Sequence, residues 1–133
     1  MPYVRIAVAA DLTPSQVAQL QRGTTELMAR LLGKRADLTV VSVARDDAVC
    51  WSVGGNPATR TMAQIQAFIT EGTNTAEEKE AFIAAAHTLL TEVVGESDGP
   101  LYVIVSEVSA GNWGYDGLSQ QARRNLWTGR AAA

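Results

Sequence analysis

Two long amphipathic stretches, each set between apolar segments, dominate the hydrophobic pattern of this chain. Residues 2–10, PYVRIAVAA, place Val4, Ile6 and Val8 on one face at period two, which predicts a strand. Residues 14–32 have an apolar stripe every three or four residues, typical of a helix, formed by Val17, Leu20, Thr24, Leu27 and Leu31. Residues 38–44, LTVVSVA, are almost continuously apolar and predict a second strand, buried on both faces.

Start and stop signals bracket the predicted helix. Thr13 and Gln16 have the spacing of a capping box, in which each side chain bonds the backbone of the other residue. Pro14 suits the first helical turn, and Gly33 supplies the stop. The sequence therefore predicts both ends of this helix.

The same order returns in the second half of the chain. Residues 62–69, MAQIQAFI, predict a third strand, and residues 100–108, PLYVIVSEV, predict a fourth. Between them, Thr75 and Glu78 form a second capping box, and Gly95 ends a second helix. The apolar stripe of that helix consists of Phe82, Ile83, Ala86, Leu89, Leu90, Val93 and Val94.

These elements predict an α+β fold made of tandem β-α-β repeats. A helix between two strands implies a parallel, right-handed crossover in each half. We expect a single domain over residues 1–133, with pseudo-repeats 1–59 and 60–133, a four-stranded sheet and both helices on one face. The other face of the sheet, which we expect to be largely apolar, needs a cover, and a partner subunit is the simplest one.

Composition and charge narrow the classes of function. The chain has 133 residues, 47% of them hydrophobic and 19% charged, and a formal net charge of −3, which favours a soluble protein without nucleic-acid or membrane partners. The N-terminus does not resemble a signal peptide. Cys50 is the single cysteine, which excludes an internal disulfide and favours a cytoplasmic location. Its apolar setting, AVCW, predicts a buried and inert thiol.

Pro2 follows the initiator methionine directly, at the start of a strand. Proline lacks the N–H group that a sheet ladder needs, so the first position of a strand tolerates it. Methionine before a small residue is normally removed, which leaves a secondary amine at the N-terminus. An α-amino group titrates near neutral pH, and an apolar pocket disfavours its charged form. Pro2 is therefore a candidate general base.

The second half carries a resemblance to a known family. Residues AQIQAFITEGTNTAEEKEAFIAAAHTLLTEVVG and PLYVIVSEVSAGNWGYDG resemble the 4-oxalocrotonate tautomerase subunit over nearly its full length. The first half, from Pro2 to CWSVGG, looks like a more diverged copy. The whole chain thus resembles the two-repeat form of the tautomerase superfamily, which includes fused tautomerases, malonate semialdehyde decarboxylase and cis-3-chloroacrylic acid dehalogenases. The resemblance implies a homotrimer, a catalytic N-terminal proline and no cofactor.

The sequence departs from the family where many relatives bind a substrate carboxylate. In the turn ITEGTNT, Thr70 and Thr73 stand where those relatives carry arginines, and Tyr102 matches the arginine early in the last strand. Met28 aligns with the helix histidine of the dehalogenases. Threonine and tyrosine cannot make the bidentate contacts of arginine. The substrate therefore carries less negative charge, or Arg5, Arg45 or Arg60 supplies the anchor.

The predicted hairpin GNWGYDG holds the other candidate site residues. Trp113 aligns with the aromatic residue that lines the tautomerase pocket, and an alternative is that it only packs the hairpin. Asn112 and Tyr115 can donate hydrogen bonds to an enolate oxygen. Asp116 is a candidate second acid, although the favoured interpretation of Tyr115 and Asp116 is a surface turn.

The remaining candidates favour structural roles. Trp51 is assigned to an intersubunit core, and His87 to the boundary of the second helix. His87 has no second histidine or cysteine cluster beside it, so no metal site is expected. Residues 118–127, LSQQARRNLW, predict a short helix whose Leu118, Ala122 and Leu126 dock on the body, with Arg123 and Arg124 on a solvated face.

Three functional hypotheses remain at this point. The first is a cofactor-independent tautomerase in which Pro2 is the general base for keto–enol proton transfer on a small carbonyl compound or keto acid. The second is a hydratase or decarboxylase of a small unsaturated or semialdehyde acid, with protonated Pro2 as general acid. The third is a noncatalytic binding module, either on this fold or on an unrelated ferredoxin-like domain.

Overall fold

The computed structural model describes the backbone of residues 2–132 and the side chains of residues 2–129. Met1, which we expect to be removed, lies outside the described residues. A four-stranded sheet has the order β2-β1-β5-β6, and its elements are β1 (Tyr3–Ala9), β2 (Val40–Arg45), β5 (Met62–Thr70) and β6 (Tyr102–Val108). β1 pairs with β2 and β5 with β6 in parallel, whereas β1 and β5 are antiparallel. The predicted parallel crossovers are confirmed.

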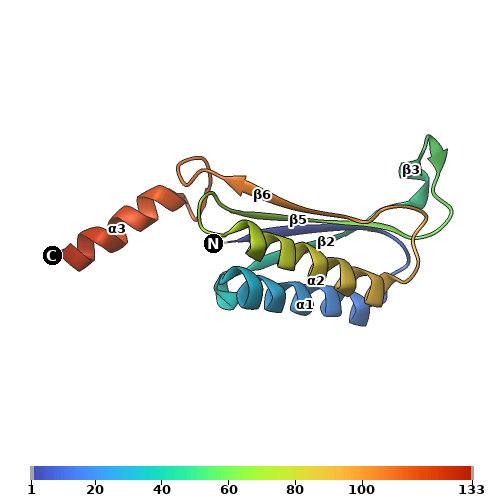
Figure 1. Cartoon of the computed structure of the whole chain (residues 1–133), viewed down its shortest axis with the longest axis horizontal. Coiled ribbons are helices and arrows are strands. Elements are labelled where there is room, and N and C mark those ends of the chain that lie inside the picture. The colour runs from blue at the N-terminus through green and yellow to red at the C-terminus, as the bar shows by residue number, and fades with distance from the viewer. Residues whose placement is uncertain (1, 133) are drawn as a thin grey trace.

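Both long helices cover the same face of this sheet, as Figure 1 shows. They are α1 (Pro14–Leu32) and α2 (Ala76–Val94), and each begins with a complete capping box, at Thr13 and at Thr75. Gly33 ends α1 in the left-handed conformation, with φ of 66°. The fold predicted from the sequence, two β-α-β units with both helices on one face, is therefore confirmed, together with its helix boundaries.

The core lies between these helices and the sheet. Phe82, Leu20 and Ile65 are fully buried there, together with the inward residues of β1. The two helices approach each other closely at Gly23, where an added Cβ would lie 2.8 Å from a methyl carbon of Leu89. The apolar stripes predicted from the sequence thus meet in one layer.

The second strand differs from its prediction. Within this chain no residue of β2 is buried, because β2 lies at the edge of the sheet and α1 covers only one of its faces. Val41 and Val43 pack toward the core, whereas Val40 and Ser42 face the open side. The apolar run therefore reflects residues that face two different environments.

The open face of the sheet is also more polar than expected. Tyr3 donates or accepts a 3.2 Å hydrogen bond with Ser42, and Gln66 donates one of 3.2 Å to Ser106. Arg5 lies on the same face, beside Gln66 in the register. Apolar groups are interspersed, and Tyr102 and Ile104 are 63% and 38% exposed. The face is a mixed surface rather than a continuous apolar one.

The antiparallel pairing of β1 and β5 puts the start of one repeat beside the end of the other. Tyr3 pairs with Phe68, so Pro2 lies next to the carboxyl end of β5. The small hairpin β7 (Gly114–Tyr115) and β8 (Leu118–Ser119) follows β6 at this end, and α3 (Gln120–Ala132) comes directly after it. In Figure 1, α3 projects from this end and the hairpin of β3 (Ser52–Val53) and β4 (Asn56–Pro57) lies at the other.

Two further expectations are corrected by the structure. Cys50 is exposed, because it ends the short 3-10 helix Ala48–Cys50 in the loop after β2 instead of entering the core. The predicted docking of the C-terminal helix is wrong for Leu126, which is 53% exposed, and for Leu118, which is 38% exposed and lies in the strand before the helix, whereas Ala122 is half-buried. Among the described residues, no helix combines the length and the apolar character that a membrane crossing requires.

Candidate functional site

Pro2 is buried where two cavities meet. We call the first, of about 390 Å³, the cationic cavity; its lining consists of Pro2, Lys34, Ile69, Thr70, Thr73, Gln120, Arg123, Arg124 and Trp127. We call the second, of about 250 Å³, the aromatic cavity; Pro2, Tyr3, Val40, Trp113, Gly114, Tyr115 and Gln120 line it. Pro2 and Gln120 belong to both. A small molecule at Pro2 can thus extend in two chemically different directions.

The turn after β5 forms one wall of the cationic cavity. Its backbone is fixed to β6, because Glu71 donates from N to the carbonyl of Val108 at 2.9 Å and Gly72 donates to the Glu107 carboxylate at 3.3 Å. Lys79 of α2 pairs with the same carboxylate. The pKa of Glu107 is lowered mainly by the hydrogen bond from Lys79 and, to a smaller extent, by the one from the backbone of Gly72. Glu107 therefore stays ionised and fixes the turn.

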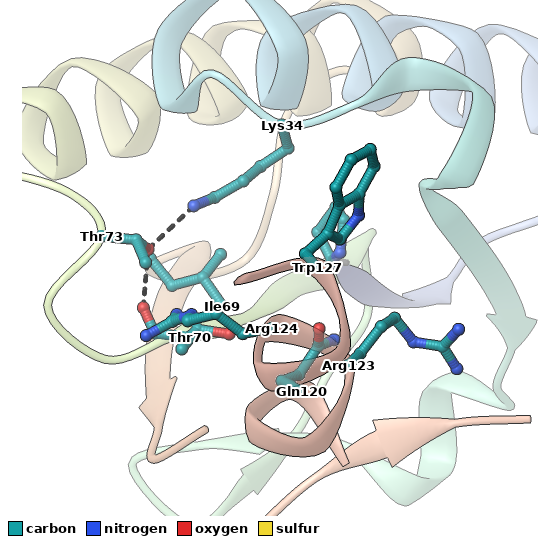
Figure 2. Close-up of a pocket in the computed structure, with 9 residues that line it drawn as sticks. Lys34, Ile69, Thr70, Thr73, Gln120, Arg123, Arg124 and Trp127 are labelled. Atoms are coloured by element: carbon teal, nitrogen blue, oxygen red, sulfur yellow. Dashed lines mark hydrogen bonds between the residues drawn. The ribbon is translucent and has the colours of Figure 1, made fainter. Parts of the chain in front are cut away.

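Lys34 reaches this cavity from the end of α1. Asn74 donates a 3.0 Å hydrogen bond to the carbonyl of Leu32 and so joins the turn to the end of the helix. The Nζ of Lys34 donates to the Thr73 hydroxyl at 2.9 Å, as Figure 2 shows. Burial lowers the pKa of Lys34, while Glu78 and Glu107 act against this. Thr73 thus positions a half-buried ammonium in the cavity.

The hairpin connects β5 to α3. The indole N–H of Trp113 donates to the Thr70 hydroxyl at 3.2 Å. Gly114 permits a tight hairpin, because an added Cβ would lie only 2.0 Å from the carbonyl oxygen of Leu118. Trp113 therefore lines the aromatic cavity with its ring while its N–H holds the hairpin against the strand.

One face of α3 completes the cationic cavity. Gln120, Arg123, Arg124 and Trp127 line it at helical spacing. The guanidinium carbon of Arg123 lies 3.7 Å from the ring centroid of Tyr115, and its Nη2 donates to the Tyr115 carbonyl at 2.8 Å. Such a cation–π contact combined with a hydrogen bond fixes the first turn of the helix. The sequence prediction that Arg123 faces solvent is therefore wrong.

Three of the residues predicted from the sequence come together at this end of the sheet. Pro2, Trp113 and Tyr115 all line the aromatic cavity. Asn112 comes from the same hairpin, but it is exposed and its backbone N–H closes a turn on the Ser109 carbonyl. Asp116 is also exposed, at a φ of 49° in the tip of the hairpin.

The other predicted residues lie elsewhere in this chain. Tyr102 begins β6, and Arg45 ends β2 opposite Val8, so both are about 20 Å from the Pro2 end at the usual rise per residue. Arg5 is nearer, but its side chain is on the open face of the sheet. Arg60 pairs with Glu96 at 3.3 Å at the far end.

Two structural assignments concern residues outside the cavities. Trp51 packs with Ala9, Ala58 and Met62 in its own chain, and its indole donates to Asp46 at 3.0 Å. His87 is exposed on α2. No cluster of three or more histidine, cysteine or acidic residues suited to a metal ion exists within the described part of the chain.

Sequence reasoning missed the cations of the site. Lys34, Arg123 and Arg124 line the cavity with Pro2, and no carboxylate is among its lining residues. The position of Lys34 had a signal, because a residue directly after the Gly33 stop lies at the sheet end where β1 begins. The sequence carried no signal that would place Arg124 at the site, because the direction of α3 is set by the hairpin before it. The cavity is therefore positively charged, which favours an anionic ligand.

Comparisons with known proteins place this chain in a family. A sequence model described as "Tautomerase enzyme" matches residues 63–123. The protein named "Probable tautomerase K2" from Dickeya dadantii (strain 3937) is 35% identical over 65 residues, which are 48% of this chain and 97% of that protein. The chain therefore belongs to the tautomerase family. This membership supports a tautomerase-type function and sets aside an unrelated ferredoxin-like domain.

Solved structures match the fold over nearly the whole chain. The structure titled "Q0 fused 4-OT wild type symmetric trimer" has a TM-score of 0.81 at 19% identity, covering 91% of this chain and 98% of that one. "Crystal Structure of Pt0534 Inactivated by 2-Oxo-3-pentynoate" has a TM-score of 0.82 at 22% identity, with the same coverage. The fold is thus that of the fused, two-repeat tautomerases.

Proposed function

We propose that this protein is a cofactor-independent tautomerase whose general base is the amine of Pro2, freed by removal of Met1, and whose substrate is a small keto acid. The observation that carries the proposal is the position of Pro2, buried where the cationic and aromatic cavities meet. The family membership of the chain agrees with this reaction type.

The reaction moves one proton from carbon to oxygen, with the amine of Pro2 as its carrier. The amine takes a proton from the carbon next to the carbonyl; the electron pair of that C–H bond forms the C=C bond, and the carbonyl electron pair moves to oxygen. The enolate is then protonated on oxygen by the same amine. Positive charge from Lys34, Arg123 and Arg124 stabilises the enolate as it forms.

The charges of the cationic cavity favour a base over an acid at Pro2. Burial and neighbouring cations both disfavour a protonated amine and so lower its pKa. Three cations and no carboxylate line the cavity, so we infer that the amine is neutral at neutral pH. A hydratase or decarboxylase that uses a protonated Pro2 is therefore the less favoured alternative.

The first test combines an intact mass with a Pro2→Ala variant. We expect a mass without Met1, and a loss of at least about 100-fold in kcat/KM for ketonisation of an enolised α-keto acid, because a freely rotating primary amine replaces the ring-held secondary amine that is positioned for proton transfer. Pro57→Ala, a change at an exposed proline of β4, is the matched control and keeps full activity. Wild-type activity in Pro2→Ala would overturn the role of Pro2 as the base, and a retained Met1 would favour the noncatalytic module.

The pH profile and a covalent probe separate the remaining alternatives. With Pro2 as base, kcat/KM rises with pH as the amine loses its proton; with Pro2 as acid, it falls. Since a structural neighbour is described as inactivated by 2-oxo-3-pentynoate, we expect that compound to add to the N-terminal peptide of this protein. Product analysis with an acetylenic or a semialdehyde acid tests the hydratase and decarboxylase alternatives directly.

The same family relations lead us to propose a homotrimer. One structural neighbour is titled a symmetric trimer, and the open sheet face of this chain exposes Tyr102 and Ile104 between polar groups. In such an assembly, residues of the open face such as Arg5 contact a neighbouring subunit. Tyr102 and Arg45 are then candidates for completing the site of another subunit.

A further inference from the structure

In the C-terminal helix, the first turn is held by contacts to the hairpin, whereas the side chains of the second turn that border the cavity lack such contacts. Arg123 is held by Tyr115, and the backbone N–H of Gln121 donates to the Ala110 carbonyl at 2.9 Å. One turn later the situation changes. The guanidinium of Arg124 makes no hydrogen bond or ion pair with another described residue, and Trp127 is 74% exposed. Both nevertheless line the cationic cavity.

Lys34 and Arg124 approach this cavity from different elements. Figure 2 shows the Lys34 side chain entering from the end of α1, toward Thr73, and the Arg124 side chain extending from α3 toward the same wall. Within the described residues, the Thr73 hydroxyl is the only hydrogen-bond partner of the Lys34 ammonium. Two cations thus line one cavity without a neutralising carboxylate among its lining residues.

We propose that Arg124 is the specificity-determining residue of this site, and that it binds the carboxylate of the substrate together with Lys34. This inference rests on the proposed function for the identity of the ligand as a substrate. A guanidinium can bind both oxygens of a carboxylate, which Thr70 and Thr73 on the facing turn cannot do. Arg124 therefore supplies from α3 the anchor that the turn lacks.

Arg124, not Arg123, has this role because the Arg123 guanidinium is already committed. Its Nη2 donates to the carbonyl of Tyr115, its planar group lies over the ring of Tyr115, and its Nε is buried without a hydrogen-bond partner among the described residues, so the group is held in place by the hairpin. Trp127 lies one turn beyond Arg123 on the same helix face and borders the cavity. An anion between Lys34 and Arg124 therefore lies beside the indole and within the space that Pro2 borders.

The test measures binding without turnover. The probe is phenylglyoxylate, an α-keto acid with no enolisable hydrogen, and the measurement is titration calorimetry on the full chain. We expect Arg124→Gln to raise Kd at least about tenfold, since one charge-assisted pair is lost. Arg22→Gln makes the same charge change at an exposed residue of α1 outside the cavity and leaves Kd unchanged. Arg124→Lys is expected to fall between Arg124→Gln and wild type.

A kinetic comparison shows that the carboxylate is the recognised group. Wild type is expected to prefer an enolisable α-keto acid over its methyl ester, and Arg124→Gln to lose that preference mainly through KM. Equal Kd values for wild type and Arg124→Gln, or no binding of the probe by wild type, would overturn the inference. If Arg124→Gln weakens binding but no keto acid is turned over, the proposed function fails while the anion site stands. If Pro2→Ala loses activity but Arg124→Gln binds normally, only the role of Arg124 fails.

Discussion

Asp98 shows how one side chain joins two loops at the sheet end opposite Pro2. Its carboxylate accepts hydrogen bonds from the backbone N–H groups of Thr59 and of Arg60, the latter at 2.6 Å. The hydrogen bond from the backbone of Arg60 is the largest cause that lowers the pKa of Asp98 below its ordinary value of 3.8, and the hydrogen bonds from Thr59 lower it further. The folded protein therefore binds a proton at this group less readily than the unfolded chain does.

The pH dependence of stability follows from the sign of that shift. A depressed pKa contributes stability that is fully present above the unfolded value and is lost as pH falls through the folded one. We expect Asp98→Asn to lower the free energy of unfolding at pH 6, and this difference to shrink as pH falls below about 3.8. Urea unfolding at several pH values measures it. Asp11→Asn removes an exposed carboxylate without a hydrogen bond to a described residue; it is the matched control and is expected to leave the free energy of unfolding at pH 6 unchanged.

At the scale of elements, α3 differs from α1 and α2 in how it is supported. Phe82, Ala86 and Leu90 of α2 are fully buried against the sheet, whereas Leu126 and Trp127 of α3 are exposed. Backbone hydrogen bonds of a helix with few buried contacts open more easily. We expect α3 amides to exchange with deuterium far faster than α2 amides in a mass-spectrometry experiment. Equal protection of the two helices would mean that α3 packs against another surface, which contradicts this expectation.

At the scale of the whole molecule, we expect copies to associate through the open sheet face. We expect light scattering to give about 43 kDa, three times the 14.2 kDa chain. Ile104→Arg places a charge on the open face and is expected to shift the protein toward monomers, because a buried unpaired charge is strongly unfavourable. Ile83→Arg, on α2, is the matched control: Ile83 is 39% exposed and Ile104 is 38% exposed. If the Ile104→Arg variant still forms trimers, the interface between subunits does not lie on the open face.

Much of the fold could be predicted because its signals are local. The capping boxes at Thr13 and Thr75, the Gly33 stop and the alternation in β1 each depend on residues within a few positions of one another. Pro2 was identifiable for the same reason, as the residue directly before a strand. The apolar run of β2 was misread because periodicity does not tell an edge strand from a central one.

The sequence by itself determined the two β-α-β units, the ends of both long helices and the position of Pro2, since chain-local hydrogen bonding and side-chain periodicity specify them. Only the tertiary structure decided which cations meet at Pro2. Lys34 and Arg124 are 90 residues apart, and their convergence depends on the β1–β5 register and on the direction in which the hairpin sends α3. Those two features arise from pairing and packing between distant segments, and no local pattern encodes them.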